Sequence, residues 1–184
     1  MKKFILVMAL VAASVCANAQ EKARLTVKVG GGYAGLIGAE SDNVKFDTSF
    51  KAGIGCEFPL NDLIGIEPSF MYCQKGFSGE TPKSPNYGDY KWNVKYIEVP
   101  VMCNFHLNDK FVLGTGLYFA SLIDDYGLSD TNSFDSGLAV NLKYNFKNGL
   151  SVGADMTTGF SRVFKNIEAY NCMVGIVAGY SFSF

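Results

Sequence analysis

Seven ionisable side chains stand singly in stretches of sequence that otherwise alternate between apolar and small polar residues. They are Lys28, Lys51, Glu57, Glu67, Glu98, Lys143 and Asp155. Each falls in the small polar row of its stretch, so all seven are predicted to share one face. Charges of both signs on an enclosed face either pair with one another or line a path for ions, because an unpaired buried charge is costly.

Enzymatic chemistry has weak support in the sequence. The only histidine is His106, beside a predicted turn at Asn108. Barrels that hydrolyse or transfer acyl chains need a serine and a histidine near the outer leaflet, and His106 is predicted at the opposite end. The run Gly30-Gly31-Gly32 is not a phosphate loop, because no helix follows it. We expect no catalytic residues, no cofactor and no enzymatic activity.

Metal binding is also weakly supported. Four cysteines follow the N-terminal segment, at Cys56, Cys73, Cys103 and Cys172. Their spacing fits no zinc motif, and the alternation places Cys73 opposite the other three, which argues against a disulfide framework. Asp124, Asp125 and Asp130 could hold a cation, although a solvated acidic loop is the commoner structure.

The first 19 residues are predicted to be a signal peptide that is removed. Lys2 and Lys3 precede an apolar run of 12 residues, and Ala17-Asn18-Ala19 is a small-residue cleavage site, so cleavage is expected after Ala19. The run is too short to span a bilayer as a helix. Residues 20–184 then form one domain with 14 basic and 17 acidic residues. This composition lacks the excess of basic residues that is typical of nucleic-acid-binding proteins.

The remaining chain alternates with a period of two and shows no helical period. This pattern predicts eight strands, near residues 25–35, 50–59, 64–77, 92–107, 111–122, 134–146, 150–160 and 169–184. Three connections, at residues 60–62, 108–110 and 147–149, are tight and contain the Asn, Asp and Gly that turns favour. The other four are longer. Turns sorted to one end and loops to the other are typical of an outer-membrane barrel, with the turns in the periplasm.

The composition of the two faces indicates which one lies outside. The apolar row carries aromatic residues near both strand ends, among them Phe58, Phe105, Phe111, Tyr33 and Phe50. The polar row is mainly Gly, Ser, Asn and Thr with few charges, which suits a crowded interior better than a water-exposed surface. We therefore predict an all-β fold, an eight-stranded antiparallel up-and-down transmembrane barrel. The soluble alternative, a lipocalin-like barrel, predicts the reverse orientation.

The last predicted strand ends on an aromatic row that includes Tyr180, Phe182 and Phe184. This ending resembles the signal that the outer-membrane assembly machinery reads, and closure against the first strand would leave no unpaired edge in lipid.

The stretch Tyr96-Ile97-Glu98-Val99-Pro100-Val101, followed by a tight turn and then by Gly114-Thr115-Gly116-Leu117-Tyr118, resembles a known family. It is that of the small outer-membrane β-barrel proteins of the Bacteroidota, often labelled porin family or outer membrane β-barrel domain, similar in fold to OmpA and OmpX. The resemblance covers all of residues 20–184. It implies the outer membrane of a Gram-negative bacterium, contact with its lipid and lipopolysaccharide, and no single activity or known extracellular partner.

Two local expectations follow for the fourth strand. Pro100 cannot donate a ladder hydrogen bond, so a bulge or a local break is predicted there. Glu98 is predicted to point inward, and Glu98→Gln should lower resistance to denaturant. By position along the strands, Lys28 and Lys143 are expected near the level of Glu57, Glu67 and Asp155, with Lys51 and Glu98 nearer the loops.

The leading functional hypothesis is a non-enzymatic barrel with a plugged lumen, whose exposed loops contact surface partners or neighbouring lipid. Eight strands leave an interior just wide enough for side chains, which favours a plug. The alternative is a narrow porin-like channel for ions or small solutes.

Overall fold

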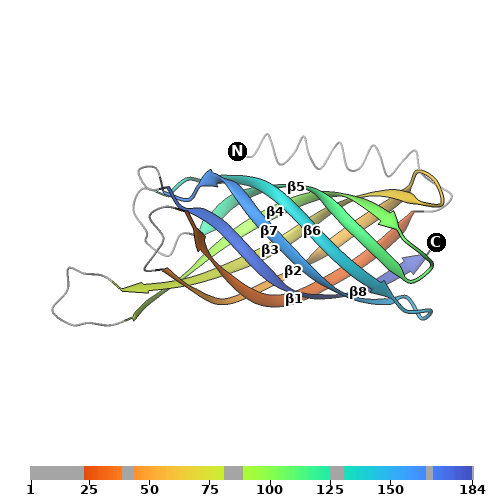
Figure 1. Cartoon of the computed structure of the whole chain (residues 1–184), viewed down its shortest axis with the longest axis horizontal. Coiled ribbons are helices and arrows are strands. Elements are labelled where there is room, and N and C mark those ends of the chain that lie inside the picture. The colour runs from red at the N-terminus through yellow and green to blue at the C-terminus, as the bar shows by residue number, and fades with distance from the viewer. Residues whose placement is uncertain (1–22, 39–43, 81–88, 125–130, 165–167, 184) are drawn as a thin grey trace.

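The eight strands that the sequence predicts close into a single antiparallel barrel in which every strand pairs with its neighbours in chain order (Figure 1). The computed structural model describes residues 23–38, 44–80, 89–124, 131–164 and 168–183. The strands are β1 Arg24–Ile37, β2 Val44–Pro59, β3 Ile64–Glu80, β4 Asp89–His106, β5 Phe111–Asp124, β6 Phe134–Asn145, β7 Leu150–Arg162 and β8 Tyr170–Ser183. Closure by pairing β1 with β8, from Arg24↔Ser183 to Ile37↔Tyr170, leaves no free sheet edge along this seam.

Three strand ends reach further than the apolar alternation predicts. β2 begins at Val44 rather than near Phe50, β3 continues to Glu80, and β4 begins at Asp89. Backbone pairing continues through this region, as in Glu80↔Asp89. Alternation marks only the part of a strand with one apolar face, whereas the ladder needs backbone groups alone. The β3–β4 hairpin consequently projects beyond the barrel wall at the loop end (Figure 1).

The short turns lie together at the end of the barrel where β8 ends (Figure 1), and each has an asparagine that accepts backbone N–H groups. Asn61 Oδ1 accepts from Leu63 and Ile64, Asn108 Oδ1 accepts from Lys110 and Phe111, and Asn148 Oδ1 accepts from Leu150. In the third turn, Gly149 adopts a φ of 85°, which side-chain-bearing residues rarely adopt. The sorted arrangement of tight turns and longer connections agrees with the prediction.

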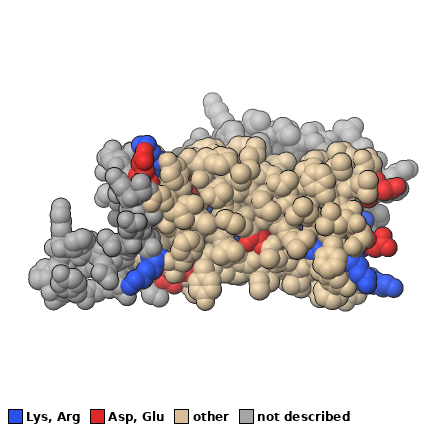
Figure 2. Space-filling model, in the orientation of Figure 1, with Lys and Arg blue, Asp and Glu red and all other residues tan. Residues whose placement is uncertain are grey.

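The apolar face of the strands points outward. Ile54 is 51% and Ile176 is 64% exposed, whereas Lys51 and Glu98 are only 5% and 3% exposed. In the space-filling view most charged side chains gather at the two ends, and the surface between them is largely uncharged (Figure 2). A soluble barrel would bury the apolar row and expose the charged one. The structure has the reverse order, which suits an apolar surrounding.

Of the predicted aromatic ends, Phe105, Phe111, Tyr33 and Phe50 are exposed, whereas Phe184 lies outside the described residues. At the turn end the Tyr144 ring makes edge-to-face contacts with Phe111 and Phe146, with centroids 5.1 and 4.8 Å apart. Tyr33 and Phe50 are exposed nearer the loop end. Phe58 keeps the register of this row through its pairing with Ile66, but it is only 4% exposed.

The local break expected at Pro100 is present, but without a bulge. Pairing of β4 with β3 passes from Val101↔Pro68 to Glu98↔Met71 in an unchanged register, with no pairing between. Pairing with β5 continues through Pro100↔Tyr118. The interruption is therefore limited to the side of β4 that faces β3, and it does not change the register of the strand.

Candidate functional site: the polar interior of the barrel

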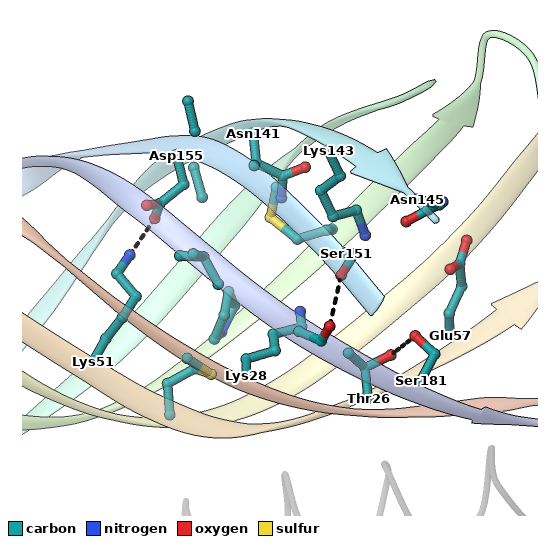
Figure 3. Close-up of a pocket in the computed structure, with 18 of the residues that line it drawn as sticks. Thr26, Lys28, Lys51, Glu57, Asn141, Lys143, Asn145, Ser151, Asp155 and Ser181 are labelled. Carbon is teal, nitrogen blue, oxygen red and sulfur yellow. Dashed lines mark hydrogen bonds and ion pairs between the residues drawn. The ribbon is translucent and has the colours of Figure 1, made fainter. Parts of the chain in front are cut away.

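The barrel interior is hollow in its turn half and filled in its loop half. A cavity of about 330 Å³ extends inward from the turn end, where Arg24 and Lys147 line it, to the level of Lys51 and Glu98. Figure 3 shows Lys28, Lys51, Glu57, Lys143 and Asp155 lining this cavity from β1, β2, β6 and β7. Its inner end is lined by Met71 and Met102, which belong to a cluster of buried side chains that also includes Tyr96, Tyr118 and Phe77.

Glu67 is the centre of the network in the hollow half. Its Oε1 accepts from Lys28 Nζ, and its Oε2 accepts from Lys143 Nζ at 2.7 Å and from Asn104 Nδ2 at 2.6 Å. Lys28 Nζ also donates to Ser69 Oγ at 3.1 Å. Glu67 itself is 1% exposed. These contacts connect β1, β3, β4 and β6, so one carboxylate ties together four strands of the barrel wall.

Lys51 and Asp155 form a second pair across the lumen, between β2 and β7. The sequence places Asp155 at the level of Lys28 and Lys143 with Lys51 nearer the loops, yet the partner of Asp155 in the structure is Lys51. The tilt and stagger of the strands shift residues of equal distance from the turns to different levels.

The third cluster fills the lumen in the loop half and is centred on Lys75. Its Nζ lies 3.3 Å from Glu98 Oε2 and 3.8 Å from Asp135 Oδ2, and Lys75 is 1% exposed. The same ammonium lies 5.1 Å from the ring centroid of Tyr96 and 4.9 Å from that of Tyr118. Ion pairing and the faces of two aromatic rings together compensate a cation that burial would otherwise destabilise.

Hydrogen bonds extend the Lys75 cluster across the barrel. Tyr118 Oη donates to Asp135 Oδ2 at 3.0 Å, and Asn171 Nδ2 donates to the same oxygen at 2.8 Å. Together with Lys75 and Glu98, these side chains come from β3, β4, β5, β6 and β8, so the cluster spans much of the cross-section. We call Lys75, Tyr96, Glu98, Tyr118, Asp135 and Asn171 the upper cluster.

The remaining predicted residue, Glu57, lies toward the turn end. Its Oε1 is 2.7 Å from His106 Nε2. All seven sequence-predicted charges thus lie on the inner face, but in four separate groups: Lys28, Glu67 and Lys143; Lys51 and Asp155; Glu98 with Lys75; and Glu57 with His106.

Sequence reasoning missed Lys75, Tyr118 and Asp135. The signal that could have found them is parity: Lys75 continues the row Glu67, Ser69, Met71, Cys73 by one more step, and Asp135 precedes Gly137 in the inward row of β6. Both lie near the loop ends of their strands. The alternation of apolar and polar residues is weaker there, so inward-facing residues are easily assigned to a loop.

Other kinds of site find no support in the described part of the chain. No group of three or more His, Cys, Asp or Glu there is arranged to hold a metal ion. Among the described residues there is also no helix of the length and hydrophobicity needed to cross a membrane.

The closed eight-stranded barrel, with its apolar outer row, inward charges and sorted connections, defines the class of integral outer-membrane β-barrels. The sequence matches the family described as Outer membrane protein beta-barrel domain over residues 18–165, and the chain belongs to that family. It is accordingly a protein of the bacterial outer membrane. No curated protein sequence matches the chain.

Solved structures share this fold at low sequence identity. Ail, the attachment invasion locus protein of Yersinia pestis, is 16% identical, with 89% of this chain and 100% of that chain covered and a TM-score of 0.53. Ail in complex with the heparin analogue sucrose octasulfate is 20% identical over the same shares, with a TM-score of 0.51. Neisserial surface protein A is 15% identical, with 86% and 97% covered and a TM-score of 0.49.

Proposed function

We propose that the protein is a non-enzymatic barrel of a Gram-negative outer membrane, of the Bacteroidota type, with a plugged lumen. Its role is carried by the surface at its loop end, where it contacts partners or neighbouring lipid and lipopolysaccharide. The upper cluster is the observation that carries the plug. Its side chains come from five strands, and Lys75, Tyr96, Glu98, Tyr118, Asp135 and Asn171 are each at most 3% exposed.

The surface role is supported by the shape of the loop end. β3 and β4 remain paired out to Glu80↔Asp89, beyond the point at which β4 leaves β5 at Lys95↔Asp124. A paired hairpin that projects from the wall offers a preformed surface for contact. Ail, whose name refers to attachment, shares the fold of this chain, and this likeness supports the proposal by analogy.

The alternative function is a narrow channel for ions or small solutes. The cavity of about 330 Å³ favours it, because half of the lumen is already open. A channel further requires that the upper cluster moves aside, at the cost of separating Lys75 from two carboxylates and two aromatic rings.

Planar-bilayer recording of the refolded protein separates the two functions. We expect no steady discrete openings from the wild type, and we expect them from the double variant Lys75→Ala/Tyr118→Ala, which removes the centre of the upper cluster. Lys95→Ala is the matched control, because Lys95 pairs with Asp124 near the loop end and lies outside that cluster. Steady openings of the wild type would establish the channel instead.

A further inference from the structure

The proposed surface role gives no function to the hollow turn half of the lumen, and that cavity has an excess of positive charge. Lys28 and Lys143 share the single carboxylate of Glu67, and Arg24 and Lys147 line the cavity nearer the turns.

The cavity also contains carboxylates, and each of them has a partner within the barrel. Glu57 is hydrogen-bonded to His106, Asp155 pairs with Lys51, and Glu98 faces Lys75. Because His106 is charged only when protonated, Glu57 counts as a full negative charge. With Glu67 included, the cations Arg24, Lys28, Lys51, Lys143 and Lys147 still outnumber the carboxylates Glu57, Glu67, Glu98 and Asp155, and Glu98 also faces Lys75.

The two lysines that share Glu67 have hydrogen-bond donors to spare. An ammonium carries three N–H donors. Lys28 Nζ uses two of them, on Glu67 and Ser69, and Lys143 Nζ uses one, on Glu67. Within the described residues, the remaining donors of these two groups have no protein acceptor. Their side chains are 13% and 18% exposed, and both line the cavity.

The rest of the cavity determines what could accompany an anionic group. At about 330 Å³ it lies at the small end of the range for ligand sites. Met71, Met102 and Ala139 add apolar surface beside the two lysines, and Thr26, Ser151 and Ser181 add hydroxyl groups. Charge, hydroxyls and apolar surface together suit a short polar carbon skeleton with one anionic end.

We propose that this cavity is a binding site for a small organic anion, a phosphate or carboxylate on a short carbon skeleton, that enters from the turn end. Lys28 and Lys143 hold the anionic group, and the net positive charge of Arg24 and Lys147 attracts it to the entrance. The upper cluster closes the other end, so the ligand is bound rather than passed through. This site is independent of the surface role proposed above.

The test is titration of the refolded protein in an uncharged maltoside detergent with glycerol 3-phosphate, inorganic phosphate or glycerol, followed by amide NMR. Gly153 and Gly179 line the cavity and report binding there, whereas Gly76 does not line it and is the reference. We expect saturable shifts of the two cavity signals with glycerol 3-phosphate, weaker binding of inorganic phosphate, and no saturable shift with glycerol.

Lys143→Met should weaken glycerol 3-phosphate binding about tenfold, because it removes a charge-assisted hydrogen bond, and Lys143→Arg should restore most of it.

Lys110→Met is the matched control, because Lys110 is exposed in the β4–β5 turn and does not line the cavity; it should bind as the wild type does. Arg24→Met provides a second variant that leaves the contacts of Glu67 intact, and it should also weaken binding. Gel mobility before and after boiling establishes that each variant is folded. The proposal is overturned if glycerol 3-phosphate gives no saturable shift, if the shifts fall outside the cavity, or if folded Lys143→Met and Arg24→Met bind as tightly as Lys110→Met.

Discussion

At the scale of single residues, the interior charges differ in how many partners depend on them. Glu67 satisfies two ammonium groups and an amide, whereas Glu98 faces one ammonium that has Asp135 as a second anion at 3.8 Å. Removing one member of a buried ion pair leaves the partner uncompensated, and this loss costs more than the pair itself contributes. The two carboxylates should therefore differ in their contribution to stability.

We expect Glu67→Gln to lower the free energy of unfolding by about 3 kcal/mol, because it leaves the ammonium groups of two lysines without the carboxylate that they share. Glu98→Gln should also lower resistance to denaturant, but by less. Glu168→Gln is the control, since Glu168 pairs with Arg162 on the surface and such pairs contribute less than about 1 kcal/mol. Urea unfolding in lipid vesicles, followed by gel mobility, measures all three. Equal midpoints for Glu67→Gln and the control would contradict the network.

At the scale of elements, the turns make a separate and smaller contribution. Asn108 Oδ1 accepts from two backbone N–H groups, both at 2.9 Å, and thereby fixes the β4–β5 turn. Asn108→Ala should lower the free energy of unfolding by about 1 kcal/mol, and the neighbouring change Asp109→Ala should have a smaller effect. Urea midpoints of the two variants check this. A larger loss from Asp109→Ala would show that the asparagine does not hold the turn.

The strands and turns could be predicted from sequence because their signals are local. Alternation gives the strand and its faces, and Asn, Asp and Gly mark the turns. The charge pairs could not be predicted, because they join residues such as Lys51 and Asp155 whose relative height depends on the stagger of eight strands. Lys75 and Asp135 were missed for a different reason: near the loop ends the outer row is no longer uniformly apolar, so the sequence loses the contrast that identifies the inner row.

At the scale of the whole molecule, the fold requires that the outer row faces lipid. Ile176, at 64% exposure, lies in the middle of β8 and tests this requirement. Ile176→Lys should lower the free energy of unfolding in vesicles by about 2–4 kcal/mol, as expected for a cation near the centre of a bilayer. Leu60→Lys is the control, because Leu60 is exposed in a turn. If Ile176→Lys unfolded at the same denaturant concentration as the control, this face would not be in contact with lipid.

The wide sequence separation of the interior ion pairs has a consequence for biogenesis. Lys51 and its partner Asp155 are separated by 104 positions in the sequence, and Glu67 and its partner Lys143 are separated by 76 positions. A sheet of the first five strands that entered the bilayer alone would carry Lys28 with Glu67 and Lys75 with Glu98, but it would leave Lys51 without Asp155, which lies on β7. Stepwise threading of hairpins into the membrane would thus expose the unmatched ammonium group of Lys51 to hydrocarbon. The order of charges along the chain therefore favours entry of a nearly complete cylinder, with its last hairpin already in place.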